Sequence, residues 1–428
     1  MEQNNSHNPT YPLHTPSGAK SAELIATARK YWSENYKPRD MILDHGKGSI
    51  VWDLDGNDYV DLGAGIAVSS LGHQDPDLLA ALHAQASKIW HTSNIFYTQP
   101  AIELAELLVE ATPFAKRAYF CNSGAEAIEA AIKVVRKWGA NNGRPPEHRE
   151  IISFAGSFHG RTLAAVTATA QPKYHEGFEP LPAGFVYCNK FNDLEALRAC
   201  ISERSLAIII EPVQGEGGIT SATREFMQGV RKLCDEHKML LIADEIQCGI
   251  ARTGVLFGHL YGDDMRPDIM TLAKALGCGV PIGAMLLGEK VEHVLQVGSH
   301  GTTYGGNPVM CAVALAAFKK LQSASLLANV VERSEQAFIA LNHINDELDI
   351  FSQVRGRGLM IGAELQPYLH GKAPEISEYL RKYGVLVLVA GNNVMRFLPP
   401  LNITKAEMQL GMERIMFGLR AYMSAKNE

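Results

Sequence analysis

The chain has 428 residues, of which 46% are hydrophobic and 20% are charged, and its formal net charge is −6. A chain of this length can bury a large core and is expected to form more than one domain, while its acidic balance argues against a nucleic-acid-binding protein. The seven cysteines include no C-x-x-C pair, which argues against a disulfide framework or a metal site and favours a reducing cytoplasm.

The N-terminal segment is polar. Residues 1–20 read MEQNNSHNPTYPLHTPSGAK and contain no apolar core of the kind found in a secretory signal, so we expect a mobile tail. No run of about 18 apolar residues occurs along the chain, and no membrane span is expected. Within 21–75, the stretch GSIVWDLDGNDYVDL places turn residues between two apolar runs, which predicts a β-hairpin in the first part of a smaller domain.

The central region, residues 76–318, alternates short apolar runs with helical patterns. In 124–138, Ile128, Ala131, Ile132 and Val135 recur at helical spacing and predict one buried helix face. The apolar runs are almost continuous, as in strands that are covered on both faces. They lie at 117–121, 150–154, 184–188, 206–210, 240–244 and 268–272. We therefore predict an α/β fold with a mainly parallel central sheet and helices on both faces. Residues 319–428 mix strand and helix patterns and end in an amphipathic helix near 404–424; we assign them to the rest of the smaller, α+β domain.

Chemistry-bearing residues follow three of the predicted strands. Ser123 and Gly124 come where the first strand gives way to a helix, and the free N–H groups of a helix's first turn form an anion site. Asp244 ends a buried strand, and Lys274 follows the next one. Each feature alone has a structural explanation: a helix cap, an ion pair with a residue such as Arg252, or a solvated lysine. Together, at the carboxyl edge of one sheet, they match the phosphate, ring nitrogen and aldehyde of pyridoxal phosphate.

Six sequence blocks then carry a resemblance over about residues 40–425. They are NSGAEA, FHGRT, EPVQGEGG, LIADEIQCGIARTG, PDIMTLAKALGCGVPIGA and GTTYGGNP, in this order. The chain resembles the class III (ω-type) aminotransferases, which have the fold type I architecture and use pyridoxal phosphate. The similarity is strongest to members that use N-acetylornithine. Two departures occur, Phe158 where many relatives have tyrosine, and GCG at 277–279 where a glycine run is usual.

The resemblance also implies roles for individual residues. Lys274 would form the Schiff base with the cofactor, and Asp244 would pair with the ring nitrogen. Other expected cofactor contacts are Ser123, Gly124 and Ala125 at the phosphate, Phe158 and Ile246 on the ring faces, Gln247 at the ring hydroxyl, and Thr303 at a phosphate bound in the second subunit of a homodimer. The expected substrate-binding residues are Arg161, Glu216, Thr302 and Arg396. Arg161 and Arg396 resemble the two carboxylate-binding arginines of the family, and Glu216 resembles the gate residue that pairs with the second arginine in some ω-aminotransferases.

The resemblance implies transamination between N-acetylornithine and 2-oxoglutarate, giving N-acetylglutamate 5-semialdehyde and glutamate. We expect Arg396 to bind the α-carboxylate of either donor and Arg161 its far end. Alternatives are another ω-amino donor (N-succinylornithine, N-succinyl-diaminopimelate, 4-aminobutyrate or ornithine), a mutase or decarboxylase reaction on the same cofactor, or a non-catalytic relative. Neither nucleic acid nor a membrane is expected as a partner. His159 we interpret as a packed structural histidine, and Glu211 as an acceptor for buried backbone.

Overall fold

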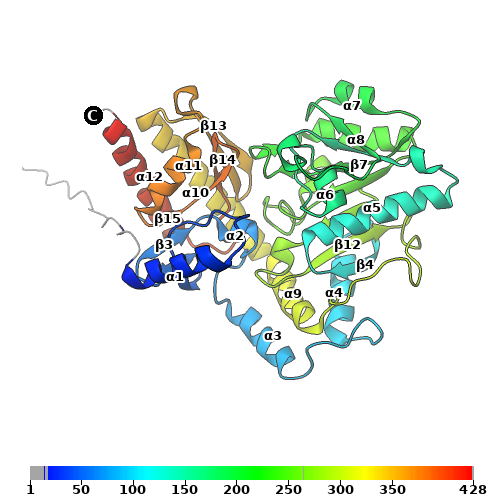
Figure 1. The fold of residues 1–428 in the computed structure, drawn as a ribbon, viewed down its shortest axis with the longest axis horizontal. Helices are drawn as coiled ribbons and strands as arrows, with labels where there is room; N and C mark the ends of the chain where they lie inside the picture. The colour runs from blue at the N-terminus through cyan, green and yellow to red at the C-terminus, as the bar shows by residue number, and fades with distance from the viewer. Residues whose placement is uncertain (1–13, 15–17, 264, 427–428) are drawn as a thin grey trace, which may run out of the picture.

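A computed structural model describes His14, residues 18–263 and residues 265–426. The expected tail, residues 1–20, lies outside the described residues apart from His14 and 18–20. Figure 1 shows two bodies side by side, one built on residues from the middle of the chain and one that combines its two ends. The division at residues 75 and 318 stays a prediction.

The larger body is built on a sheet with the strand order β4-β12-β11-β10-β7-β5-β6 in the described part of the chain. Its strands β5, β6, β7, β10 and β11 run parallel, and β12 is antiparallel to both of its neighbours. The six expected strands and the mainly parallel sheet are confirmed, whereas β12 was not anticipated. The bounds are β4 (Ala115–Cys121), β5 (Glu150–Phe154), β6 (Phe185–Cys188), β7 (Ser205–Ile210), β10 (Leu240–Asp244), β11 (Ile269–Leu272) and β12 (Gly283–Gly288).

Both faces of this sheet are covered by helices. Alternate residues of a strand point to opposite faces, so Ile209 packs in one apolar cluster and Ile208 and Ile210 pack in another. The first cluster includes the predicted stripe of α5, with Ile128 and Ile132, and is completed by α6. The second includes apolar residues of α4, α7, α8 and α9. The helices are α3 (Pro76–Ala86), α4 (Gln99–Glu110), α5 (Gly124–Asn141), α6 (Leu163–Ala168), α7 (Leu194–Cys200), α8 (Arg224–Glu236) and α9 (Pro308–Leu321).

The smaller body joins the two flanks of the chain. Val385 pairs with Val60 in a sheet of order β1-β2-β3-β15, and β13-β14-β17-β16 form a second sheet. The predicted hairpin is confirmed, since β2 pairs antiparallel with β3 across the turn that holds Gly56. The bounds are α1 (Ala19–Tyr31), β1 (Leu43–Lys47), β2 (Ile50–Asp53), β3 (Asp58–Asp61), α2 (Ala64–Ala67), α10 (Ala324–Leu348), β13 (Phe351–Arg357), β14 (Met360–Leu365), α11 (Ala373–Arg381), β15 (Val385–Leu386), β16 (Leu388–Ala390), β17 (Val394–Phe397) and α12 (Lys405–Lys426). Helix α12 is the amphipathic helix expected near 404–424.

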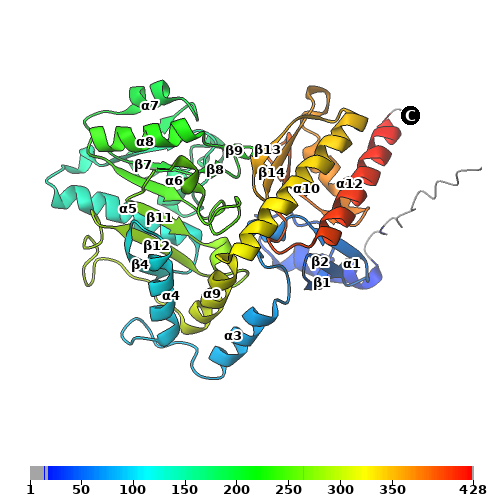
Figure 2. The same cartoon turned by 180° about the vertical axis from the view of Figure 1, so that it is seen from behind.

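Short elements complete the fold. A two-stranded hairpin lies between the bodies, and 3-10 turns follow several strands. They are β8 (Val213–Gln214), β9 (Thr220–Ser221), η1 (Pro146–His148), η2 (Pro172–Tyr174), η3 (Gly258–Gly262), η4 (Lys274–Leu276) and η5 (Pro367–Leu369). Figure 2 shows α10 leaving the larger body beside α9 and running along the smaller one. No single helix of the described residues is long and apolar enough to cross a membrane; α9 and α10 pass such a test only as a pair, and they are bent by 66° at their junction.

Candidate active site

A cavity of about 410 Å³ opens at the carboxyl edge of the large sheet. Its position follows from the topology, because β4, β10 and β11 all end there and ligands bind beyond the strand ends of such sheets. The predicted residues that line it are Ser123, Gly124, Ala125, Phe158, Arg161, Asp244, Ile246, Gln247 and Lys274. Four other predicted residues, Thr302, Thr303, Glu216 and Arg396, are not part of its lining.

The start of α5 forms one end of the cavity. Ser123 is the N-cap residue, and its Oγ accepts a hydrogen bond from the N–H of Glu126 at 3.2 Å. Gly124 packs closely against Ile246, because a Cβ at this position would lie 2.9 Å from Cδ1 of Ile246 and would displace that side chain. The backbone N–H groups and dipole of this 18-residue helix make its first turn suited to an anion such as a phosphate.

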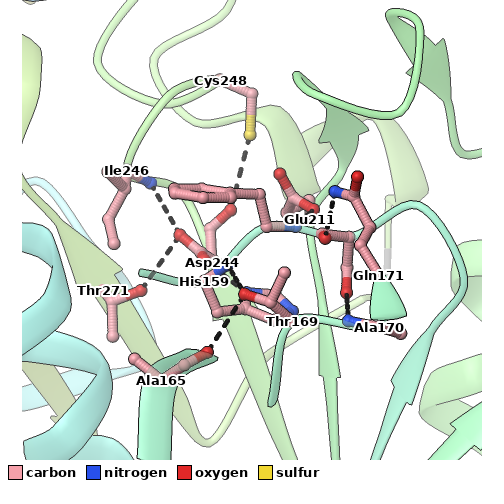
Figure 3. A network of polar contacts seen from close by, with 12 residues as sticks. His159, Ala165, Thr169, Ala170, Gln171, Glu211, Asp244, Ile246, Cys248 and Thr271 are labelled. Carbon is pink, nitrogen blue, oxygen red and sulfur yellow. Dashed lines mark hydrogen bonds and ion pairs between the residues drawn. The ribbon is translucent and has the colours of Figure 1, made fainter. Parts of the chain in front are cut away.

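Asp244 occupies the middle of the site and is only 3% exposed. Figure 3 shows its carboxylate receiving hydrogen bonds from three sides: from the N–H of Ile246 at 3.1 Å, from Oγ1 of Thr271 at 3.4 Å, and from the ring of His159, whose Nδ1 lies 2.7 Å from Oδ2. Three donors stabilise the ionised form of a carboxylate. The carboxyl group of Asp244 is therefore fixed in orientation where it lines the cavity.

The partner of Asp244 is His159 and not Arg252. His159, which we interpreted as structural packing, is in hydrogen-bond contact with Asp244 through Nδ1. Arg252, the partner considered from the sequence, instead donates to the carbonyl oxygens of Leu359 and Pro399 and ties the two bodies together. The only sequence signal for His159 was its place directly after Phe158, and its pairing with a residue 85 positions away could not be read from spacing.

A second acid, Glu211, lines the same cavity and is buried. It accepts a hydrogen bond from the N–H of Phe158 at 3.0 Å, in agreement with the expected backbone role. Burial, and next the negative charge of Asp244, raise the pKa of Glu211 well above its usual range. This environment favours the protonated form of Glu211 relative to an exposed glutamate.

Lys274 follows β11 directly and begins η4 with a left-handed backbone, at φ +41°. Such a conformation is strained for a residue with a side chain. The side chain faces the cavity, so the residue stays partly exposed. Burial of the amine, followed by the positive charge of Arg396, lowers the pKa of Lys274 to about 8. A substantial fraction of this amine is neutral, and hence nucleophilic, near neutral pH.

The two predicted arginines are held in different ways. Arg396 on β17 is buried, and its Nη1 lies 2.6 Å from Oε1 of Glu216. Arg161 is exposed, and its guanidinium lies 4.1 Å from the ring centroid of Tyr174 and 5.5 Å from that of Phe158. Stacking orients Arg161 while leaving its donors available. The site thus contains one arginine paired with a carboxylate and one held only by aromatic rings.

Thr302 and Thr303 lie on the loop before α9. Oγ1 of Thr302 accepts a hydrogen bond at 2.8 Å from Nδ2 of Asn122, a residue that does line the cavity. Thr303 is exposed and does not line this cavity. Asn122 was not singled out from the sequence, although it stands directly before Ser123. No cluster of His, Cys, Asp or Glu that could hold a metal ion occurs among the described residues.

Comparison with known proteins identifies the family. The model of the class-III aminotransferases matches residues 31–417. The chain belongs to the class-III aminotransferases. This aminotransferase is 53% identical to the acetylornithine aminotransferase of Xanthomonas axonopodis pv. citri over 405 residues, which cover 94% of this chain and 99% of that one. The predicted family and its fold type I architecture are thereby confirmed.

Solved structures agree with this assignment. The N-acetylornithine aminotransferase of Stenotrophomonas maltophilia K279a has 45% identity and a TM-score of 0.83, over 94% of this aminotransferase and 100% of that chain. An ornithine aminotransferase of Toxoplasma gondii has 32% identity and a TM-score of 0.90, over 97% of each chain, and its structure is described as having partial occupancy of PLP at the active site.

Proposed function

We propose that this aminotransferase binds pyridoxal phosphate in the cavity described above and transfers the amino group of N-acetylornithine to 2-oxoglutarate. The products are N-acetylglutamate 5-semialdehyde and glutamate, which places the enzyme in arginine biosynthesis. The identity of 53% to an acetylornithine aminotransferase supports this substrate. The seven cysteines are free thiols, which fits the cytoplasm as its location.

The residues present fit the cofactor. Oε1 of Gln247 is buried and has no hydrogen-bond partner among the described residues, so it is available to accept from the ring hydroxyl. The first turn of α5, with Ser123, Gly124 and Ala125, would hold the phosphate. Phe158 and Ile246 would pack on the two ring faces, and the Asp244 anion would meet the ring nitrogen.

The cofactor and the side chains of the protein would each supply part of the reaction. When bound, pyridoxal phosphate supplies an aldehyde for the donor amine and a ring that takes up the electron pair released from the donor's C–H bond. Nζ of Lys274, with its pKa lowered to about 8, would accept the proton from that carbon and deliver it to the carbon on the other side of the transferred nitrogen. The buried negative charge of Asp244 favours a protonated ring nitrogen throughout.

The observation that carries the substrate assignment is the ion pair between Arg396 and Glu216. Glutamate reacts at its α-carbon, which bears a carboxylate. N-acetylornithine has an acetylated α-nitrogen, so its free amine is on the δ-carbon, which bears none. An arginine beside Lys274 must therefore be available for one donor and neutralised for the other. Arg396 lies close enough to Lys274 to lower its pKa, and Glu216 supplies the neutralising charge.

This chemistry does not fit our expectation that Arg396 binds the α-carboxylate of N-acetylornithine, because that carboxylate is at the far end of the reacting molecule. Arg161 is the residue suited to it, since it lines the cavity and has no carboxylate partner among the described residues. Glutamate would present its side-chain carboxylate to the same arginine. Thr302, held by Asn122, would lie beside the substrate.

The other donors and reactions considered from the sequence would use parts of the same site. N-succinylornithine and N-succinyl-diaminopimelate keep the same reacting end and are secondary donors. Ornithine would bring its α-ammonium group toward Arg161 at the far end of the site. 4-Aminobutyrate is shorter, but its reacting carbon also has no carboxylate, so it too suits an Arg396 whose charge is neutralised by Glu216. A mutase would not require 2-oxoglutarate, whereas two arginines suit a dicarboxylate. The presence of Lys274 argues against a non-catalytic binding protein.

We also propose a homodimer with shared sites. A patch of exposed apolar side chains lies on the segment before α4 and on the loop before α9; its members are Trp90, Ile95, Phe96, Tyr97 and Tyr304. Hydrogen bonds from Asn94 to the Thr302 carbonyl and from Asn307 to the Trp90 carbonyl hold the two segments together. Contiguous apolar surface of this kind marks a protein interface, and Thr303 lies within it, where it would reach the phosphate bound by a second copy.

The test is a pair of half-reactions on the pure protein. Adding N-acetylornithine to the cofactor-loaded enzyme is expected to bleach the cofactor's absorption and to release one equivalent of the 5-semialdehyde; 2-oxoglutarate is then expected to restore the absorption. Single-turnover rates for N-succinylornithine, N-succinyl-diaminopimelate, ornithine and 4-aminobutyrate are measured beside it. A faster reaction with ornithine or 4-aminobutyrate would contradict the assignment, and so would restoration without an oxo acid.

A further inference from the structure

A second cavity, of about 550 Å³, lies where the two bodies of the structure meet. We call it the junction cavity. It is lined by β13 of the smaller body, by β9 with the residue before it, and by Phe338 of α10. Figure 2 shows β9 beside β13 at this junction. The junction cavity shares no lining residue with the active-site cavity, and its volume is in the range of small-molecule binding sites.

One face of β13 forms a polar wall of the junction cavity. Gln353, Arg355 and Arg357 occupy alternate positions of this strand, so their side chains leave the same face. Both arginines are paired in the ladder with uncharged residues of β14. Glu364, further along β14, forms an ion pair with Arg355, and no acid lines the cavity in the described part of the chain. The wall therefore keeps one positive charge that Glu364 does not neutralise, that of Arg357.

Arg357 is held in a fixed orientation by uncharged groups. Its guanidinium lies 4.3 Å from the ring centroid of Tyr261, and its Nη2 donates to the carbonyl oxygen of Ala222 at 2.7 Å. The ring of Tyr261 is fixed in turn, because its hydroxyl donates to the carbonyl oxygen of Thr253. Nη1 of Arg357 is buried and has no hydrogen-bond partner within residues 18–263 and 265–426. Burial lowers the pKa of Arg357, and no carboxylate is among the groups that act on it.

A second unpaired donor belongs to the same lining. Oγ of Ser221, on β9, is buried and has no hydrogen-bond partner among the described residues. The main chain at this position is fixed, because β9 pairs with β8 and the Ser221 carbonyl accepts a hydrogen bond from Nδ2 of Asn192 at 2.9 Å. Buried polar atoms are nearly always paired with protein, water or an ion. A guanidinium N–H and a hydroxyl without partners beside one cavity therefore suit a ligand that accepts hydrogen bonds and carries a negative charge.

Apolar side chains supply much of the remaining lining. They are Ile219, which is fully buried, and Phe338 and Val354, which are half-buried. Sites for organic ligands combine such apolar surface with a few fixed polar groups. An inorganic anion would use Arg357 and Ser221 but would leave this apolar surface in contact with water.

We propose that the junction cavity binds a small organic carboxylate, whose charged group contacts Arg357 and Ser221 and whose carbon body packs against Phe338 and Val354. The guanidinium provides a charge-assisted hydrogen bond to the carboxylate. Because Tyr261 and Ala222 already orient Arg357, little side-chain entropy is lost on binding. The inference does not depend on the proposed function, since no residue of the active-site cavity takes part.

Calorimetric titration of the cofactor-loaded protein with three probes tests the ligand class. Benzoate joins a carboxylate to an apolar ring, benzamide has the same shape without the charge, and inorganic phosphate has the charge without the ring. The titrations use Arg161→Ala, because Arg161 lines the active-site cavity and could bind the same probes there. We expect benzoate to bind at least about tenfold more tightly than either of the others. Equal binding of benzamide or of phosphate, or no binding of benzoate, would overturn the proposal.

Substitutions in the lining test the two donors. Arg357→Gln is expected to weaken benzoate binding by about 10- to 100-fold, the usual effect of losing a hydrogen bond to a charge, and Ser221→Ala to weaken it less. Arg357→Lys keeps the charge without the planar group that stacks on Tyr261, so an intermediate loss is expected. The matched control is Arg224→Gln, because Arg224 acts on Arg357 by its charge but pairs with Asp263 and does not line the cavity. Unchanged affinity in Arg357→Gln, or an equal loss in Arg224→Gln, would overturn the proposal.

The unmodified protein gives a readout that does not depend on any variant folding. Crystals of the loaded protein soaked with 4-bromobenzoate reveal the bromine by anomalous scattering. We expect bromine in the junction cavity, on the side of Phe338, with the carboxylate of the probe at Arg357. Bromine only in the active-site cavity or on the outer surface, with none in the junction cavity, would overturn the proposal.

Discussion

The guanidinium of Arg396, on β17 of the smaller body, lies 2.6 Å from the carboxylate of Glu216, on the segment between β8 and β9. Neither residue belongs to the large sheet, so separation of the pair would not require that sheet to move. In the proposed function, the state of this pair would decide whether a carboxylate can bind next to the reacting carbon.

Removing the charge of Glu216 is predicted to separate the two half-reactions. In Glu216→Gln, Arg396 loses its neutralising partner, so we expect KM for glutamate to fall and KM for N-acetylornithine to rise, each by about tenfold. Single-turnover kinetics with each donor measure this. Glu364→Gln is the control, because Glu364 pairs with Arg355 outside the cavity. Parallel changes for both donors would argue against the pair as a selector.

The amine of Lys274 is predicted to react at a lower pH than ordinary lysines. Its pKa is lowered to about 8 by burial and by Arg396, so the amine is protonated below that pH and neutral above it, whereas an unperturbed lysine with a pKa of about 10.4 stays protonated. Competitive acylation of the cofactor-free protein, read by mass spectrometry, measures the midpoint. Arg396→Ala should raise this midpoint, because it removes a positive charge. A midpoint above about 10 in the unmodified protein would contradict the prediction.

Arg161 is predicted to serve the far carboxylate of both donors. Arg161→Ala should lower kcat/KM for N-acetylornithine and glutamate by about 10- to 100-fold, because each loses a charge-assisted contact. Alanine, which has no far carboxylate, should be affected much less. The control is Arg136→Ala, since Arg136 also lies over an aromatic ring but outside the cavity. An equal loss with alanine would mean that Arg161 acts through the fold.

The exposed patch is predicted to hold the dimer together. Phe96→Asp, at a side chain that is 69% exposed, should produce monomers in sedimentation experiments and weaken cofactor retention, because Thr303 would no longer reach a neighbouring phosphate. Ile339→Asp introduces the same charge at a 64% exposed position on α10 and should do neither. Thr303→Ala should weaken retention without dissociating the dimer. An active monomer of the unmodified protein would contradict the shared site.

Much of the fold was predictable because burial on both faces leaves a local signature. The apolar runs that end at Cys121, Asp244 and Leu272 predicted β4, β10 and β11, and the order of the strand ends predicted which side chains meet. Strand β12 was missed because its six residues, GAMLLG, begin and end with glycine and follow η4 after only a few residues. Its antiparallel direction depends on tertiary contacts and not on a local sequence pattern.

The parts of the site that local sequence patterns alone do not predict depend on contacts between distant segments. The pairing of His159 with Asp244 spans 85 residues, and that of Arg396 with Glu216 spans 180. The resemblance to the class-III family supplied the second pair but not the first. The aromatic support of Arg161 by Tyr174 likewise depends on how the segment before β6 folds back, which no local pattern encodes.

The proposed reaction depends most directly on Lys274, the lysine that would bind the cofactor covalently. Reduction of the loaded enzyme with borohydride fixes the bond between the cofactor's aldehyde carbon and a lysine amine, and peptide mass mapping locates it. We predict the added phosphopyridoxyl mass on the peptide that contains Lys274 and on no other, with the label absent in Lys274→Ala. A label on a different lysine, or none in the unmodified protein, would contradict the account.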